Sequence, residues 1–253
     1  MHCFKIITSA FCPLLLPGMM IGENRVMTPT FGDPPALPAL LELLNSQDLG
    51  DRLRAVNKAR ELPGPEALTL LQQAIADENA RVRYAAISQM GTLSGVDPAP
   101  LLPILQHSLR EDPEFDVRAA AAAALGDLKQ PQALDDLLEA YQRETEWLVR
   151  FSIVAALGEL GNPAAFDTLV QVLQEEDELL TTAAAAALGD LGDPRAIPHL
   201  EPLIDSDDWQ LRYRVCIALA QLGTEAARPG LTRLAQDPQE QVAAHARAAL
   251  ASL

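Results

Sequence analysis

The chain has 253 residues, of which 49% are hydrophobic and 21% are charged, a composition that supports a folded core and excludes an intrinsically disordered protein. Only 4% are aromatic, and Ala and Leu dominate the apolar residues, which favours helices that pack through small side chains. The formal net charge of -16 argues against binding to nucleic acids and to anionic membrane surfaces, because both require Lys and Arg.

The first 32 residues differ in composition from the rest of the chain. Their apolar run is interrupted by Pro13 and Pro17, and it is too short to span a bilayer. We expect residues 1–32 to be a disordered extension, or the product of a start codon assigned too early with Met27 as the natural start. A targeting segment is the alternative.

The cysteines and histidines predict neither disulfides nor a metal site. Cys3 and Cys12 lie in the N-terminal segment, so Cys216 is the one cysteine in the body of the chain. This count favours a reducing compartment, and we expect a cytoplasmic protein without membrane insertion. The four histidines show no metal-ligand spacing.

Residues 33–253 read as one repeated unit and are expected to form a single domain. Prolines that follow a turn signal recur at intervals of 31 to 33 residues. They are Pro34, Pro65, Pro98, Pro131, Pro163 and Pro194, and a seventh unit begins near Glu225. Each unit contains two helical stretches, so the sequence predicts an all-α solenoid of about seven helix pairs.

The ends of the predicted helices carry local signals. The first helix of a unit follows Asp-Pro or Asn-Pro, as at Asn162 and Asp193, where the side chain suits an N-cap. Pro198 and Pro202 fall inside the sixth first helix, which should be short or kinked. Glycines are predicted to mark or adjoin the ends of the second helices. They are Gly126, Gly158, Gly189 and Gly223.

Arginine and aromatic residues recur at fixed positions in the second helices. The arginines are Arg54, Arg83, Arg118, Arg150 and Arg212. The aromatic residues lie three positions before the arginine or one after it. They are Tyr84, Phe115, Trp147, Phe151, Trp209 and Tyr213. At about 100° per residue they point away from the aliphatic stripe, which predicts an aromatic band on the surface. The alternative is that they pack between adjacent repeats.

The fifth unit interrupts both series. Glu178 and Thr182 take its aromatic positions, and Thr181 stands in place of the arginine. Because packed helices lie about 10 Å apart, we expect a recess about 20 Å wide between the fourth and sixth units. It would fit one planar ligand or one partner helix. The predicted binding residues are Trp147, Arg150, Phe151, Glu178, Thr182, Trp209, Arg212 and Tyr213. No catalytic motif is found, so no catalytic residue is predicted.

The recurring pattern VRxxAxxALGxLGDPxA, over residues 34–253, resembles the HEAT-repeat family in its short form named after phycobilisome lyases. The resemblance implies a right-handed solenoid of HEAT-like helix pairs whose second helices line a concave face. It also implies that the recurring arginine bonds an acidic turn. The stretches DENARVRYAAISQM, EWLVRFSIVAALGELG and DWQLRYRVCIALAQLG are similar to cyanobacterial phycobilisome-degradation proteins of the non-bleaching B-like type.

This resemblance implies a binding or adaptor protein that acts on phycobiliproteins, in phycobilisome degradation or in bilin attachment and detachment. The candidate ligand is a linear tetrapyrrole such as phycocyanobilin, stacked on the aromatic walls with its propionates on arginines. No acid–base pair is predicted, so any lyase activity would come from positioning, and we expect a binding protein rather than an enzyme. A ligand-free protein–protein scaffold and a partner in iron–sulfur or iron handling are the alternatives.

Overall fold

The computed structural model describes residues 36–253, so the expectation for residues 1–32 falls outside the described part of the chain. Over residues 36–253 the structure consists of seven helix pairs without a β-strand. The first helices are α1 (Leu37–Leu44), α3 (Gly64–Ala74), α5 (Leu101–Glu111), α7 (Leu134–Arg143), α9 (Phe166–Leu173), α11 (Ile197–Leu200) and α13 (Arg228–Leu234). The second helices are α2 (Leu49–Lys58), α4 (Ala80–Met90), α6 (Phe115–Leu128), α8 (Trp147–Leu160), α10 (Glu178–Leu191), α12 (Trp209–Leu222) and α14 (Glu240–Ser252).

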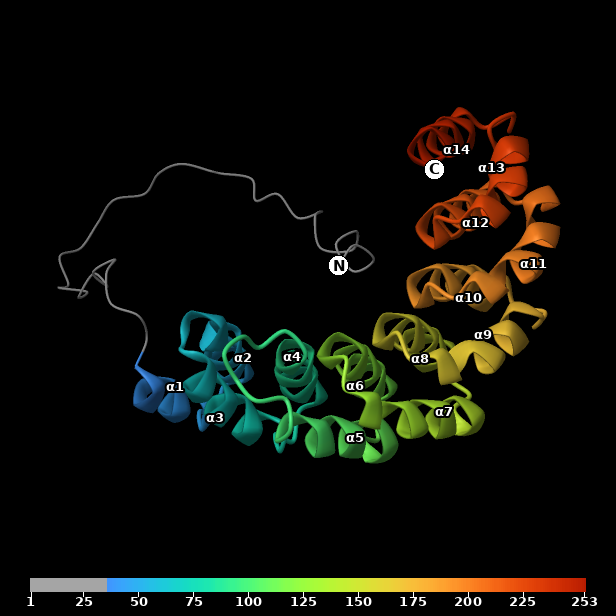
Figure 1. Cartoon of the computed structure of the whole chain (residues 1–253). Coiled ribbons are helices and arrows are strands. Elements are labelled where there is room, and N and C mark those ends of the chain that lie inside the picture. Colours follow the sequence, from blue (N-terminus) through green and yellow to red (C-terminus); the bar gives the residue numbers. More distant parts are fainter. Residues whose placement is uncertain (1–35) are drawn as a thin grey trace, which may run out of the picture. The chain divides into compact units, whose positions relative to one another are not determined.

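The pairs stack in chain order, and each second helix contacts the second helix of the next pair. Figure 1 shows the second helices as one layer, on the inner side of the stack, and the first helices as the outer layer. Because each pair buries its apolar faces on its neighbours, the core continues from one repeat into the next. The predicted all-α solenoid of about seven helix pairs is confirmed.

The prolines shape the starts of the first helices. In three repeats the proline opens a short 3₁₀ turn before the α-helix instead of occupying its first turn. Asn162 and Asp193 cap these turns, and each side chain accepts from the backbone N–H two residues later. Pro198 and Pro202 limit α11 to residues 197–200, followed by a 3₁₀ segment over 201–205. The predicted short helix is therefore confirmed.

Two sets of glycines lie near the ends of the second helices and have different roles. Gly223 does end its helix, with a left-handed φ of +57°, as Gly161 and Gly192 do. Gly126, Gly158 and Gly189, in contrast, lie buried within their helices. A Cβ on Gly158 would lie 2.6 Å from Cα of Ala187 in the next second helix. These three glycines adjoin the helix ends, as predicted, since each lies two residues before the last helical residue, and they also allow adjacent second helices to approach closely.

The second helices are buried on three sides. In α8, Val149, Ile153 and Leu157 are fully buried between the layers and the neighbouring repeats. On the remaining side, Leu148 and Glu159 stay partly exposed. None of the helices described between residues 36 and 253 combines the length and the apolar composition that crossing a membrane requires.

Candidate functional site

A ladder of arginine–acid pairs joins successive repeats at the starts of the second helices. Arg83 donates through Nε and Nη2 to the two carboxylate oxygens of Asp112, at 2.8 and 2.9 Å, and through Nη1 to the backbone carbonyl of Asp77 at 3.0 Å. The same bonding recurs elsewhere along the stack. The pairs are Arg52–Asp77, Arg83–Asp112, Arg118–Glu144 and Arg212–Asp237. Each arginine thus connects the turn of its own repeat to the turn of the next, as the resemblance implied.

Arg54 was wrongly assigned to this series. Its side chain is exposed and pairs with Asp51 of the same helix, with Nη2 and Oδ1 2.7 Å apart. Arg52 takes the ladder position instead and reaches Asp77 of the next repeat. The prediction relied on the motif of an arginine after Leu. Which arginine can bond to the acidic turn of the next repeat depends instead on the side of the helix from which it projects.

Both arginines predicted to bind a ligand are already paired. Arg150 donates to Glu175 Oε2 and to Tyr141 Oη, each at 2.7 Å. Arg212 donates to both carboxylate oxygens of Asp237, at 2.6 and 3.0 Å, and this bonding lowers the pKa of Asp237. The guanidinium of Arg212 uses Nε, Nη1 and Nη2 in its hydrogen bonds, whereas all the hydrogen bonds of Arg150 come from Nη2. Arg212 is therefore fully engaged within the stack, and Arg150 is engaged through one of its three nitrogens.

The ladder is interrupted between the fifth and sixth repeats. Thr181 stands at the arginine position and is buried, and its Oγ1 donates to the backbone carbonyl of Glu175 at 3.3 Å. Ser206 follows 25 residues later, the spacing that joins Arg52 to Asp77. Both members of the expected pair are thus replaced by hydroxyl residues. The boundary between the fifth and sixth repeats therefore lacks the arginine–acid pair that links the other neighbouring repeats.

The aromatic residues of the predicted site differ in exposure. Trp147, the first residue of α8, exposes 57% of its surface. Phe151, Trp209 and Tyr213 are half-buried and pack against the core. The ring of Tyr213 also meets His245 edge-on, with centroids 5.7 Å apart. Trp147 is therefore the most accessible of the predicted aromatic residues.

The side of α8 on which Trp147 lies is not exposed along the rest of the helix. Val154 and Gly158 point the same way, within about 20° by helical geometry. Val154 is fully buried, and Gly158 is in contact range of Ala187 of α10. The predicted aromatic face is therefore wrong for most of the helix, where that side packs on the next repeat. Trp147 is exposed because it lies at the helix start.

The fifth repeat packs against both of its neighbours, because α10 contacts α8 and α12. Its small side chains Ala184 and Ala187 are fully buried or nearly so. At the helix start, Glu178 is exposed, and Thr182 donates from Oγ1 to the Glu178 carbonyl at 2.8 Å. The alanines thus serve close packing between helices. The recess proposed between the fourth and sixth repeats stays a prediction.

A row of exposed apolar side chains runs over four successive second helices, one on each. We call it the apolar rim. It comprises Tyr84 (40% exposed), Phe115 (40%), Trp147 (57%) and Leu179 (58%). All four lie near the starts of α4, α6, α8 and α10. The prediction missed Leu179 because it considered aromatic residues only. The available signal was a Leu in the first turn of the predicted helix.

A row of acids lies near the other ends of three of these helices. We call Asp127, Glu159 and Asp190 the acidic rim. Burial raises the pKa of Glu159, the charges of Asp127 and Asp190 add to this rise, and the charge of Lys129 opposes it. Within residues 36–253 none of them forms a salt bridge. Gln221 donates to Asp190 at 2.8 Å.

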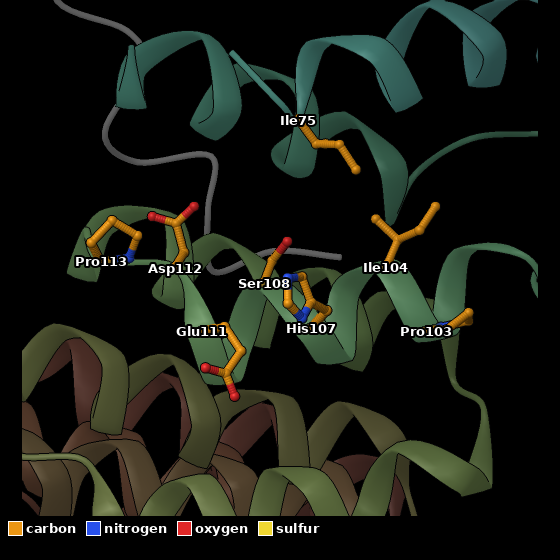
Figure 2. Close-up of a pocket in the computed structure, with 8 residues that line it drawn as sticks. All are labelled: Ile75, Pro103, Ile104, His107, Ser108, Glu111, Asp112 and Pro113. Carbon is orange, nitrogen blue, oxygen red and sulfur yellow. The ribbon is translucent and has the colours of Figure 1, made fainter. Parts of the chain in front are cut away.

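A separate open groove of about 450 Å³ lies in the layer of first helices, between α3 and α5 (Figure 2). Its lining residues are Ile75, Pro103, Ile104, His107, Ser108, Glu111, Asp112 and Pro113. The side chains of His107 and Ser108 point toward Ile75, whereas Glu111 points away from it. None of the predicted site residues lines this groove, so it is distinct from the second-helix surface.

The body of the chain has one cysteine, Cys216, and its thiol is not accessible. Cys216 is fully buried, and burial raises the pKa of its thiol to about 12, so it packs as a small core residue. In the described part of the chain, no group of three His, Cys, Asp or Glu residues is arranged to hold a metal ion.

Comparison with known proteins agrees with this architecture. Deoxyhypusine hydroxylase of Danio rerio is 31% identical over 98 residues, which are 39% of this chain and 31% of that enzyme's length. The chain therefore spans about a third of that curated relative.

Two solved structures share the fold. A chain of the complex of CpcE and CpcF of phycocyanin lyase from Nostoc sp. PCC7120 is 21% identical, with a TM-score of 0.58, over 92% of this chain and 100% of that one. The Escherichia coli protein YibA is 17% identical, with a TM-score of 0.55, over 85% of this chain and 92% of that one. The family model for HEAT repeats matches in overlapping segments: 37–126, 70–157, 102–186, 135–212 and 166–251. Together these segments cover nearly all of the described residues, and the chain belongs to the HEAT-repeat family.

Proposed function

We propose that this HEAT-repeat protein is an adaptor that binds phycobiliproteins, in phycobilisome degradation or in bilin attachment or detachment. The observation that carries the proposal is the apolar rim, since Trp147 and Leu179 each expose more than half of their surface. Large apolar side chains left uncovered in a row are typical of a protein-binding surface. The fold shared with a chain of the CpcE–CpcF complex supports the choice of partner.

The surface favours a protein partner over a small ligand. Exposed apolar groups on successive helices present a long, shallow surface, and such surfaces suit another protein. The arginines proposed to hold bilin propionates, Arg150 and Arg212, already bind Glu175 and Asp237. A bound linear tetrapyrrole therefore stays a prediction, with Trp147 as the side chain best placed to stack on it.

The proposal is tested by titrating the purified full-length chain with phycocyanin, with affinity measured by biolayer interferometry. An anchor aromatic typically contributes on the order of 2 kcal/mol to binding, about thirtyfold in affinity. We expect Trp147→Ala to weaken binding more than tenfold, whereas Gln72→Ala, an exposed change in the outer helix α3, leaves it unchanged.

The absence of phycocyanin binding by the wild-type chain would contradict the proposal. So would equal affinities for the wild type and the Trp147 variant. An absorption spectrum of the chain, purified after co-expression with bilin synthesis, answers the separate question of the chromophore. A visible bilin band would support the predicted ligand, and a colourless protein that still binds phycocyanin would indicate an adaptor without a ligand.

A further inference from the structure

The boundary between the fifth and sixth repeats differs from the other boundaries at the starts of its second helices. Thr181 and Ser206 stand where the other repeats have an arginine and an acid. Each of the other boundaries between residues 36 and 253 has such a pair. The pairs are Arg52–Asp77, Arg83–Asp112, Arg118–Glu144, Arg150–Glu175 and Arg212–Asp237. Charge-assisted hydrogen bonds fix geometry as well as adding energy, so the starts of α10 and α12 lack a restraint that the other boundaries have.

The side of α10 that faces the sixth repeat is polar at the helix start. Glu178 and Thr182 lie 11 and seven residues before Gly189, about three and two helical turns, so they project toward α12 as Gly189 does. Thr182 Oγ1 donates within its own helix, to the Glu178 carbonyl, at 2.8 Å. In the four preceding repeats the equivalent positions hold apolar or aromatic side chains. They are Leu49, Leu53, Ala80, Tyr84, Phe115, Ala119, Trp147 and Phe151. Near its start, α10 therefore contributes little apolar surface to this boundary.

The facing side of α12 carries a long charged side chain near its start. Arg214 lies four residues before Ala218, about one helical turn, so it projects on the side that faces α10. It is half-buried, and it forms no salt bridge within residues 36–253. The equivalent residues of α8 and α10 are Ser152 and Ala183, which are small and buried. The boundary without an arginine–acid pair thus also lacks the small side chain that packs at the preceding boundaries.

The ends of the same two helices are held together closely. A Cβ on Gly189 would lie 2.7 Å from Cα of Ala218, so the backbones of α10 and α12 approach each other there. Gln221 donates to Asp190 at 2.8 Å across this contact. The separation of the helices is therefore fixed at their ends.

The outer layer is joined at this edge as well. Arg195 follows the end of α10 by four residues, and its guanidinium lies 4.2 Å from the ring centroid of Phe166 at the start of α9. The ring of His199 meets the same ring edge-on, with centroids 5.9 Å apart. Because each first helix begins where the preceding second helix ends, these contacts lie at the edge of the stack that carries the second-helix ends. Specific contacts therefore join the fifth and sixth repeats at this edge, whereas the arginine–acid pair is missing at the opposite edge.

We propose that the boundary between the fifth and sixth repeats is a hinge, at which the starts of α10 and α12 separate while their ends stay in contact. Residues 193–253 rotate relative to residues 36–192 about the contact of Gly189 with Ala218. The buried residues Leu211 and Val215 of α12 remain at the helix starts, and apolar contacts have no preferred direction, so they permit this rotation. The rotation changes the curvature of the second-helix layer and the position of Leu179 relative to the last two repeats. This inference goes beyond the proposed function and does not depend on the identity of the partner.

The test measures distances between spin labels on introduced cysteines, by pulsed electron paramagnetic resonance on the full-length chain. The background carries Cys3→Ser and Cys12→Ser, and it keeps Cys216, which is fully buried. The labels lie on second helices that are three spacings apart, about 24–30 Å at about 8–10 Å per spacing.

Two label pairs occupy the same repeat positions at the helix starts. Asp116→Cys with Gln210→Cys spans the proposed hinge, and Arg81→Cys with Leu179→Cys spans three boundaries that have arginine–acid pairs. All four positions are exposed. We expect the distance distribution of the 116–210 pair to be at least about twice as wide as that of the 81–179 pair. Equal widths would overturn the proposal.

A third pair tests where the repeats pivot. Gln132→Cys with Ala226→Cys crosses the same boundary at the opposite edge, and both positions are exposed. Its distribution should be as narrow as that of the 81–179 pair, because the hinge keeps this edge in contact. A 132–226 distribution as wide as the 116–210 distribution would contradict the hinge, since the repeats would then move apart at both edges.

Restoring the missing pair should close the hinge. Thr181→Arg with Ser206→Asp is expected to narrow the 116–210 distribution to the width of the 81–179 distribution. If circular dichroism shows that this variant is unfolded, the reverse change is made at an intact boundary. Arg118→Thr with Glu144→Ser should then widen the 81–179 distribution. An unchanged width in the folded variant, whichever is used, would overturn the proposal.

Discussion

Replacing Gly158 by alanine tests the close packing that builds the second-helix layer. A Cβ at this position would lie 2.6 Å from Cα and 2.8 Å from Cβ of Ala187, whereas carbon atoms in contact lie about 3.5–4.0 Å apart. The helices α8 and α10 would have to separate by about 1 Å. Overpacking of this kind typically destabilises a protein by about 1–3 kcal/mol, while the helix propensity of Ala over Gly returns about 1 kcal/mol.

Because the clash is with Cα and Cβ of Ala187, which cannot rotate away, we take the upper part of this range, about 2–3 kcal/mol. We therefore expect Gly158→Ala to lower the free energy of unfolding by about 1–2 kcal/mol, and Tm by about 2–8 °C for a domain of this size. Thermal denaturation followed by circular dichroism measures the shift. Ala220→Gly is the matched control, because Ala220 in α12 lies eight residues after Arg212, as Gly158 does after Arg150. It reports the propensity term alone, about 1 kcal/mol. A Gly158→Ala variant as stable as the wild type would refute the close-packing role.

Three further predictions concern the ladder. Arg212→Ala should destabilise the fold by about 3 kcal/mol in urea denaturation, since it leaves Asp237 buried without its guanidinium, whereas Arg228→Ala, at an exposed pair, should leave the midpoint unchanged. Because the pKa of Asp237 is lowered in the folded chain, its stabilising contribution is present above the unfolded pKa of about 3.9 and is lost as the pH falls through the lower folded value. The wild type should thus lose more stability below about pH 4 than Arg212→Ala, and parallel pH profiles would exclude this contribution. Restoring the missing pair with Thr181→Arg and Ser206→Asp should give a favourable coupling energy in a double-mutant cycle; a double variant no more stable than Thr181→Arg alone would show that the interruption is not a missing pair.

The repeat architecture was predictable because the signals that specify it are local in the sequence. The spacing of the prolines predicted the helix pairs, and Pro198 and Pro202 predicted that α11 would be short. These signals act within one or two helical turns, where backbone sterics decide the outcome.

The errors and omissions concern contacts between repeats. Arg52 and Arg54 both lie near the start of α2, and only the position of Asp77 in the next repeat distinguishes them. Gly158 adjoins a helix end, as predicted, but its packing role depends on the proximity of Ala187.

The candidate site was predictable only in part for the same reason. A solenoid helix is buried on three sides. The prediction assumed an amphipathic helix with one buried and one exposed face, and it therefore placed the side that carries the aromatic residues on the surface. Val154 points the same way as Trp147 and is fully buried. The exposed Leu179 and the acidic rim emerge only when successive helices are seen side by side.

Photo-crosslinking to phycocyanin tests the central claim, that the second-helix layer binds the partner, most directly. A benzoylphenylalanine is placed at position 147 of the apolar rim in one variant, and at position 72 of the outer helix α3 in another. We predict a crosslinked product from position 147 and none from position 72. Crosslinking from position 72 alone, or from both positions equally, would contradict the account.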